Sequence, residues 1–250
     1  DGTRIVSSYL NTIAEDRIAG ILSFNFDYGL NQLWQTIYKG ATIYLHDLVF
    51  PNDFFDLLSR NNITVLPVMP VIITKLFDPR FYKINTANDY SSLRYICSSG
   101  GRVSEQMIDG LKSVFPNTDI VLMYGLTEAF RSTFLPPEQL VNRPTSIGKA
   151  IPDVEILVLD KNNKECGPRV QGELVHRGGC ITKGYWNDIG KTSKVFRELP
   201  EYPGEKLIFS GDIVEKDEED YLYFITRSDS MIKTYGYRVS PTEIESAAIK

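Results

Sequence analysis

Hydrophobic and polar positions follow two different patterns along this chain. From about residue 41 to residue 124, short apolar runs typical of buried strands alternate with segments whose apolar residues recur every three or four positions. The predicted strands are ATIYL, ITVLPV, LRYICSS and DIVLMY, and the predicted helices are DFFDLLSR, VIITKLF and EQMIDGLKSVF. Because consecutive strand–helix–strand units connect by right-handed crossovers, this part is expected to form a parallel sheet flanked by helices.

Capping residues mark the starts of three helices. Asn52 and Ser104 stand directly before two of the predicted helices, where a side-chain oxygen can accept a hydrogen bond from an unpaired backbone amide. A third start lies near the end of the printed sequence, where Ser240 can cap, Pro241 suits the first helical position and Glu243 completes a capping box.

After about residue 145 the pattern changes to short strands separated by polar turns. VEILVLD and GELVHRG are separated by the turn-rich KNNKECGPRVQ, and LIFSGDIVEK and YLYFITR flank the acidic turn DEED. Such spacing favours an antiparallel, barrel-like β subdomain. The predicted fold class is therefore α/β, a parallel sheet with flanking helices followed by an antiparallel β subdomain, divided as 1–145, 146–225 and 226–250.

Composition narrows the function classes. The 250 residues carry a net charge of −5, which argues against a general nucleic-acid binder, and no apolar run is long enough to span a bilayer. Three well-separated cysteines, Cys97, Cys166 and Cys180, indicate reduced thiols in a cytoplasmic protein. The two histidines, His46 and His176, have no neighbours with metal-ligand spacing.

One predicted strand ends in chemistry suited to a nucleotide. In VLMYGLTE, Tyr124 offers a flat face for a purine, Gly125 lets the backbone approach a ligand, Thr127 can donate to a phosphate oxygen, and Glu128 is a hard oxygen ligand for magnesium. Ligands collect at the carboxyl ends of strands in an open parallel sheet. A glycine turn with polar residues after a strand is also a common structural feature, so this stretch alone leaves both interpretations open.

Two further stretches add to the pattern. CSSGGR places Gly100, Gly101 and Arg102 at another strand end, a weak signal because glycine pairs mark many turns. In FSGD, the Asp212 carboxylate can accept both hydrogens of a ribose cis-diol, and Arg227 can reinforce the same sugar or a phosphate. The alternative is that Asp212 caps a turn and Arg227 is a surface charge.

Taken together, these motifs resemble those of the adenylate-forming (AMP-binding) enzymes, closest to the AMP-forming acyl-CoA synthetases. The match spans almost the whole chain, and five stretches carry it in the right order. They are YGLTE (124–128), SIGKAIPDVEILVLD (146–160), GELVHRGGCITKGYWND (172–188), SGD (210–212) and RSDSMIKTYGYRVSPTEIE (227–245).

The resemblance implies a role for each candidate residue. Thr127 would contact phosphate and act with Glu128, which would hold Mg²⁺. SFNFDYGLNQL lies where the family builds its carboxylate pocket, although core packing explains these residues nearly as well. The implied nucleotide contacts are Gly100, Gly101, Arg102, Tyr124, Gly125, Thr127, Asp212, Phe224 and Arg227. The implied substrate contacts are Phe26, Asp27, Tyr28 and Gly29. The implied hinge is Asp229, and the implied lid residues are Lys233, Gly236 and Arg238.

The implied reaction has two steps, with ATP and Mg²⁺ as cofactors. A small-molecule carboxylic acid attacks ATP to give an acyl-adenylate, and a thiol of CoA or of a carrier protein's phosphopantetheine then takes the acyl group. The motif wording favours an acyl-CoA ligase over a peptide-synthetase adenylation domain, and a non-catalytic nucleotide-binding or scaffolding module is a third hypothesis.

The sequence departs from the family at several points. Thr226 replaces the usual glycine before the ribose arginine, and Arg102 replaces a small residue. The family's phosphate loop and its C-terminal lysine do not occur in the printed sequence, which begins with Asp1. These features suggest a fragment that is inactive alone.

Overall fold

The computed structural model describes residues 1–48, 51–78, 88–228, 232–234, 237–239 and 241–249. The chain divides into two compact units. Unit 1 comprises Asp1–Gly125 and Phe134–Thr145, and unit 2 comprises Leu126–Thr133 and Ser146–Lys250. The sequence-based boundaries after residues 145 and 225 stay predictions.

Unit 1 contains the predicted parallel sheet, with strand order β2-β1-β3-β4-β5. In this register, Cys97 of β4 lies beside Pro67 of β3 on one side and Val121 of β5 on the other. The carboxyl ends of β4 and β5 therefore lie at the same edge of the sheet. The strands are β1 (Arg17–Gly20), β2 (Thr42–Leu45), β3 (Val65–Val68), β4 (Tyr95–Ser98) and β5 (Asp119–Tyr124). Four of these five strands were predicted from the sequence, and the fold class is confirmed.

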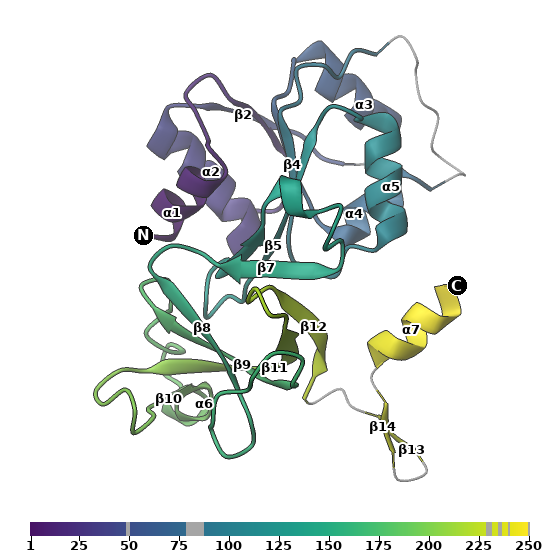
Figure 1. Cartoon of the computed structure of the whole chain (residues 1–250). Coiled ribbons are helices and arrows are strands. Elements are labelled where there is room, and N and C mark those ends of the chain that lie inside the picture. The colour runs from purple at the N-terminus through teal and green to yellow at the C-terminus, as the bar shows by residue number, and fades with distance from the viewer. Residues whose placement is uncertain (49–50, 79–87, 229–231, 235–236, 240, 250) are drawn as a thin grey trace. The chain divides into compact units, whose positions relative to one another are not determined.

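Helices cover both faces of this sheet. Helices α1 and α2 lie on one face, and α3, α4 and α5 lie on the other (Figure 1). The helices are α1 (Gly2–Tyr9), α2 (Asp27–Lys39), α3 (Pro51–Arg60), α4 (Pro70–Leu76) and α5 (Glu105–Val114). In α5 the predicted cap is confirmed, because the Ser104 hydroxyl accepts a hydrogen bond from the Met107 amide at 3.3 Å. The predicted Asn52 cap is wrong: α3 already begins at Pro51, whose fixed φ suits the first turn of a helix.

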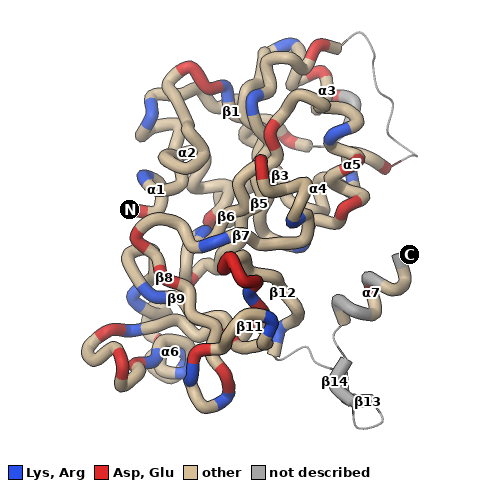
Figure 2. Tube along the Cα trace, in the orientation of Figure 1, with Lys and Arg blue, Asp and Glu red and all other residues tan. Residues whose placement is uncertain are grey.

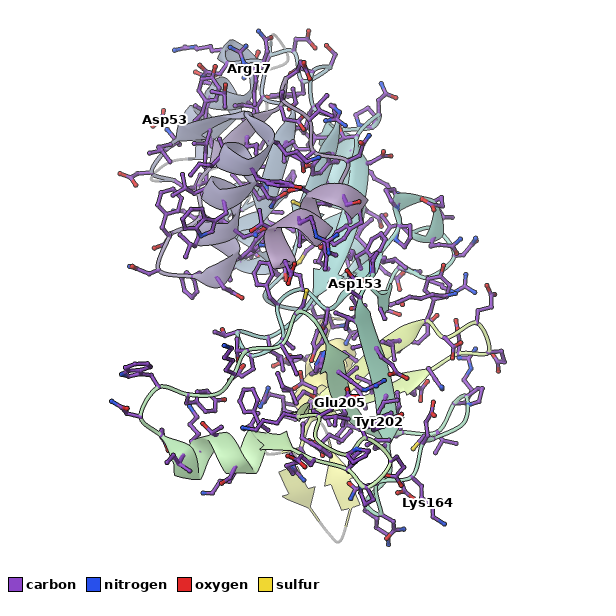
Figure 3. All side chains as sticks on the ribbon, turned by 90° about the vertical axis from the view of Figure 1, so that its left-hand side faces the viewer. Arg17, Asp53, Asp153, Lys164, Tyr202 and Glu205 are labelled. Carbon is purple, nitrogen blue, oxygen red and sulfur yellow. The ribbon has the colours of Figure 1, made fainter. Side chains whose placement is uncertain are left out.

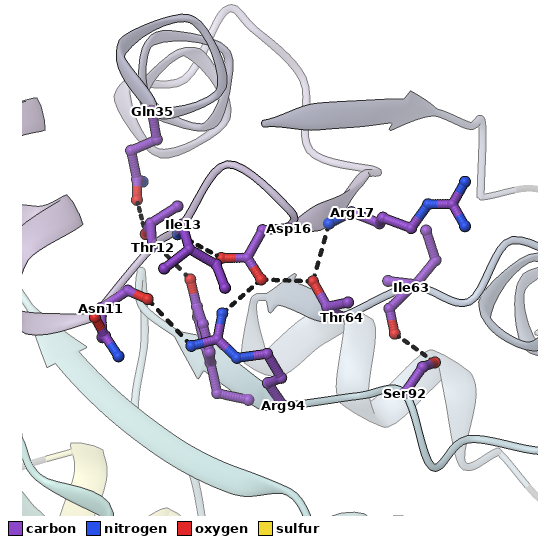
Figure 4. Close-up of polar contacts among 11 residues, drawn as sticks. Asn11, Thr12, Ile13, Asp16, Arg17, Gln35, Ile63, Thr64, Ser92 and Arg94 are labelled. Atoms are coloured by element: carbon purple, nitrogen blue, oxygen red, sulfur yellow. Dashed lines mark hydrogen bonds and ion pairs between the residues drawn. The ribbon is translucent and has the colours of Figure 1, made fainter. Parts of the chain in front are cut away.

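A buried polar cluster joins the starts of three parallel strands (Figure 4). The Asp16 carboxylate accepts hydrogen bonds from the Ile13 amide at 2.9 Å, from the Thr64 hydroxyl at 2.7 Å and from the Arg94 guanidinium at 2.6 Å. Asp16, Thr64 and Arg94 directly precede β1, β3 and β4. The cluster therefore fixes the edge of the sheet opposite to the strand ends that carry the candidate ligand residues.

Unit 2 contains antiparallel strands in the order β7-β12-β11-β9-β8, with β10 paired to β11. Four of them, β8, β9, β11 and β12, were predicted from the sequence. Its core includes Leu157, Val175, Leu207 and Phe209. The strands are β7 (Ser146–Ala150), β8 (Val154–Leu159), β9 (Gly172–Gly178), β10 (Phe196–Arg197), β11 (Leu207–Lys216) and β12 (Leu222–Arg227). The other elements of unit 2 are α6 (Ile189–Val195), β13 (Ile232–Thr234), β14 (Tyr237–Val239) and α7 (Pro241–Ile249). The 3-10 turn η1 (Pro137–Gln139) belongs to unit 1, and β6 (Thr133–Leu135) spans the boundary between the units. Helix α7 confirms the predicted terminal helix, and its predicted cap, Ser240, lies outside the described residues.

The surface of unit 2 carries several charge pairs. Arg177 of β9 donates to both carboxylate oxygens of Glu205 at 2.8 and 2.9 Å and also bonds Glu155. Its guanidinium lies 4.3 Å from the centre of the Tyr202 ring, and Tyr202 and Glu205 lie together in Figure 3.

Lys and Arg are interspersed with Asp and Glu along both units (Figure 2). Within the described part of the chain, no helix is both long and apolar enough to cross a membrane.

Candidate functional site

The structure pairs the two residues predicted to bind a ribose. Strands β11 and β12 run antiparallel, and their register sets Asp212 directly opposite Arg227. The Arg227 guanidinium donates to the Asp212 carboxylate at 2.9 Å. The Asp212 side chain is only 4% exposed, whereas that of Arg227 is 46% exposed. A buried carboxylate is thus held at a fixed position by a cation that solvent and ligands can still reach.

A local irregularity in β11 positions this aspartate. The pairing of β11 with β9 shifts register between Phe209 and Ile213, and Gly211 there has φ +73°, a conformation that favours glycine. Ser210 donates to the Leu174 carbonyl at 2.6 Å, and its hydroxyl accepts from the Asp212 amide at 3.0 Å. Bulges of this kind redirect a side chain away from the regular ladder. The predicted SGD motif therefore acts locally as a bulge with its own hydrogen bonds.

The loop that carries Glu128 is attached to the segment after β9. The Thr182 amide donates to the Glu128 carbonyl at 2.8 Å, and the Phe130 amide donates to the Cys180 carbonyl at 3.2 Å. Between these two bonds, Ala129 forms a β-bridge with Ile181. The backbone of Glu128 is therefore fixed within unit 2, only a few residues after the end of β5 in unit 1.

Tyr185 holds the Glu128 side chain. Its hydroxyl donates a hydrogen bond to Oε1 of Glu128. Burial and the neighbouring carboxylate raise the pKa of Tyr185 to about 12, so the hydroxyl stays protonated at neutral pH. Tyr185 is not among the residues predicted from the sequence, although it lies inside the GYW stretch of the motif at 172–188. No local pattern marks this tyrosine, because its hydrogen-bond partner lies 57 positions earlier in the chain.

Glu128 and Thr127 have the donor chemistry that a nucleotide-bound magnesium ion needs. Glu128 is half-buried and Thr127 is exposed. Magnesium in such sites takes one or two carboxylates and completes its shell with phosphate oxygens and water. Among the described residues, no group of three or more His, Cys, Asp or Glu side chains is placed to hold a metal ion. A single carboxylate fits a metal that a nucleotide brings with it better than a metal held by protein alone.

The other candidate nucleotide residues of unit 1 lie at one edge of the parallel sheet. Tyr124 is the last residue of β5 and is half-buried, and Gly125 follows it. Gly100, Gly101 and Arg102 follow β4, are exposed, and include a left-handed backbone at Gly100 with φ +82°. Because β4 and β5 are parallel neighbours in register, these residues lie at the same edge. Unit 1 thus groups the predicted adenine contacts, and unit 2 groups Glu128 with its tyrosine and Asp212 with its arginine. The meeting of the two sets on one ligand stays a prediction.

The candidate substrate residues divide into two exposed and two buried positions. Phe26 is 58% exposed and Asp27 is also exposed, at the start of α2. Tyr28 is buried, and its hydroxyl donates to the Cys97 carbonyl of β4 at 2.7 Å. A Cβ added to Gly29 would lie 2.1 Å from the Ser23 carbonyl oxygen, so only glycine fits there. Tyr28 and Gly29 therefore have a packing role, and contact with a substrate stays a prediction for all four.

The remaining candidates lie toward the end of the chain. Phe224 is half-buried in β12. Lys233 and Arg238 face each other in the register of the β13–β14 hairpin. Asp229 and Gly236 lie outside the described residues.

Comparisons with known proteins place this geometry in context. The profile of a family described as AMP-binding enzyme matches residues 3–186. Bacitracin synthase 1 of Bacillus licheniformis is 29% identical over 250 residues, which are 98% of this chain and 5% of the synthase. 4-Coumarate–CoA ligase 1 of Glycine max is 30% identical over 212 residues, which are 82% of this chain and 69% of the ligase.

Solved structures share the fold. O-succinylbenzoate coenzyme A synthetase (MenE) from Bacillus subtilis, in complex with ATP and magnesium ion, aligns with a TM-score of 0.84 at 24% identity. The alignment covers 100% of this chain and 50% of that one. VinN aligns with a TM-score of 0.76 at 26% identity, over 89% of this chain and 53% of that one. The chain therefore spans about half the length of these structures.

Proposed function

Because this chain belongs to the AMP-binding enzyme family, we propose that the protein containing it uses ATP to activate a carboxylic acid as an acyl-adenylate. The observation that carries the proposal is the pair of Asp212 and Arg227 on adjacent strands. A buried carboxylate can accept hydrogen bonds from two vicinal hydroxyls, and the exposed guanidinium beside it can donate to the sugar or to a phosphate. This combination suits a nucleotide ribose.

The other proposed roles follow from position. Glu128 would hold Mg²⁺, and Thr127 would donate to a phosphate oxygen. When bound, Mg²⁺ would neutralise phosphate charge and so reduce the repulsion between ATP and an approaching carboxylate anion. In unit 1, Tyr124 would lie against adenine, with Gly100, Gly101 and Arg102 lining the base and acyl pocket.

The proposed reaction proceeds in two steps. A carboxylate oxygen of the acid attacks the α-phosphorus of ATP, the bond to the β-phosphate oxygen breaks, and acyl-adenylate and pyrophosphate form. A thiolate then attacks the acyl carbonyl, and AMP leaves with the electron pair of the broken carbon–oxygen bond. Positioning and charge neutralisation are the main contributions that the protein makes to such a transfer.

We propose CoA as the thiol acceptor. The wording of the motif at 231–245 favours CoA. So does the similarity to 4-coumarate–CoA ligase 1, because the matched residues are 69% of that enzyme. A carrier-bound phosphopantetheine is the second candidate, supported by the similar identity, 29%, to bacitracin synthase 1. We place the reaction in the cytoplasm, because three well-separated cysteines, an odd number, are typical of a protein whose thiols stay reduced.

Pyrophosphate exchange into ATP tests the activation step. The full-length protein is screened with a panel of aliphatic, aromatic and amino acids, and exchange that needs both an acid and Mg²⁺ is the expected result. Glu128→Gln is expected to lower exchange at least ten-fold, while the matched control Glu198→Gln, at an exposed position in the same unit, leaves it unchanged. Exchange that survives Glu128→Gln in full would refute the metal assignment, and absence of exchange with every acid despite ATP binding would favour a nucleotide-binding module.

Two additions refine this test. CoA and a phosphopantetheinylated carrier protein are supplied in turn, and the one that releases AMP is the acceptor. The 250-residue chain is assayed beside the full-length protein and is expected to show no measurable exchange, because the family's phosphate loop and C-terminal lysine are not in its sequence.

A further inference from the structure

Tyr185 is fixed more firmly than a surface tyrosine needs to be. Its amide donates to the Thr192 hydroxyl at 2.9 Å, and that hydroxyl donates to the Asp188 carbonyl at 2.7 Å. The Lys191 ammonium lies 4.1 Å from the centre of the tyrosine ring, and Phe196 packs edge-on against it with ring centres 5.8 Å apart. These contacts come from α6 and β10, so they set both the backbone and the ring plane of Tyr185.

The same residue packs on the loop that carries Glu128. Ala129, Phe196 and Ile208 form a buried apolar cluster, and Tyr185 and Ile181 pack against it. Because Ala129 also bridges to Ile181, the backbone of the glutamate and the ring of the tyrosine share one support. The distance between the Tyr185 hydroxyl and the Glu128 carboxylate is therefore determined by packing and not by a chance surface rotamer.

A glutamate side chain has three rotatable bonds, and free rotation would spread its carboxylate over many positions. A hydrogen bond to Oε1 restricts this rotation and leaves the orientation of the whole group defined. Partners of metal-ligating carboxylates typically contribute in this way, and their removal lowers metal affinity by roughly ten-fold or more.

We propose that Tyr185 is a positioning residue that orients the Glu128 carboxylate for the nucleotide-bound magnesium ion. This inference rests on the proposed function of Glu128. It assigns a role to the GYW stretch through a contact with a loop 57 residues earlier in the chain. Tyr185 acts through Glu128 and is not expected to contact the acid or the nucleotide.

The test uses Tyr185→Phe in the full-length protein, with Tyr202→Phe as the matched control. Both remove one hydroxyl from a half-buried tyrosine of unit 2. The first measurement is Mn²⁺ binding to the protein–ATP complex by electron paramagnetic resonance, which needs no turnover. We expect Tyr185→Phe to weaken metal binding about ten-fold, to leave ATP affinity without metal unchanged, and to leave the thermal midpoint close to that of Tyr202→Phe.

A double-variant comparison separates positioning from general packing. If Tyr185 acts through Glu128, then Tyr185→Phe has no further effect on metal binding once Glu128→Gln is present. Equal ten-fold losses in both backgrounds, or no loss in either, would overturn the inference. If Glu128→Gln itself leaves metal binding unaltered, the proposed function of Glu128 fails first, which distinguishes the two failures.

Discussion

The buried histidine of unit 2 gives a quantitative prediction. His176 in β9 is fully buried, and its neighbours in register are Ile156 on β8 and Ile208 on β11. Burial disfavours the charged imidazolium and lowers the pKa of His176 to about 3. In the unfolded chain the same side chain has the ordinary pKa of about 6.5. The unfolded state therefore binds more protons than the folded state at every pH between these two values.

The sign and size of the effect follow from this difference. Stability is fully present above about pH 6.5 and is lost as the pH falls toward the folded pKa of about 3. Between about pH 7.5 and about pH 5.5, protonation of the unfolded histidine lowers the free energy of unfolding by about 1.4 kcal/mol. Glu205 and Glu218 have a reference pKa of 4.5 that pairing with arginine lowers further, so they contribute little in this interval.

Native-state hydrogen exchange of the β9 amides measures this free energy within unit 2. The wild type and His46→Gln are expected to lose about 1.4 kcal/mol across the interval, whereas His176→Gln is expected to lose only a few tenths. An equal loss in His176→Gln would refute the reasoning. If that variant does not fold, the imidazole resonances of the wild type decide the matter, because a His176 titration near pH 6.5 in the folded protein would refute it equally.

Two further variants test the structure at other points. Arg94→Met removes one partner of the buried Asp16 carboxylate and is expected to cost about 2 kcal/mol in urea denaturation, the size of a hydrogen bond to a charged group. Arg60→Met, at a surface pair with Asp56, should cost less than about 0.5 kcal/mol. Equal costs would show that the cluster in Figure 4 contributes little. Asp212→Asn is expected to weaken ATP binding by the full-length protein roughly ten-fold in calorimetry, with exposed Asp220→Asn as the control, and unaltered affinity would contradict the ribose assignment.

Local signals were sufficient for much of the fold. Strand β5 was predicted because its apolar residues are consecutive, and α5 because Ser104 caps a segment with a regular apolar face. Both features are visible within about ten neighbouring residues. Strands β8, β9, β11 and β12 of unit 2 were predicted from similarly local signals, since polar turns separate them.

The first forty residues were harder because α2 reverses the usual pattern. It buries polar side chains such as Gln32 and Gln35 and exposes Trp34, Ile37 and Tyr38, with Trp34 51% and Ile37 62% exposed. A buried polar face, in which Gln35 accepts a hydrogen bond from Thr12 and donates one to Asn31, cannot be recognised from hydrophobic periodicity. Hydrophobic periodicity therefore predicts no helix in this segment, and its residues are recognisable only as candidate pocket residues.

The candidate site was also predictable only in part. The family motifs give Asp212 and Arg227 a common ribose role, and the antiparallel register of β11 and β12 brings the two side chains into contact. The role of Tyr185 could not be found in this way, because its hydrogen bond joins segments whose proximity depends on tertiary packing.

The assignment of Leu126–Thr133 to unit 2 has a practical consequence for gene recombination among relatives. A single crossover near residue 145 would combine a Glu128 loop from one parent with a Tyr185 segment from another. Chimeras that take residues 126–133 and the segment from residue 146 onward from the same parent keep Glu128 and Tyr185 from one protein. Libraries built with that paired exchange should yield more folded members than libraries joined at one point.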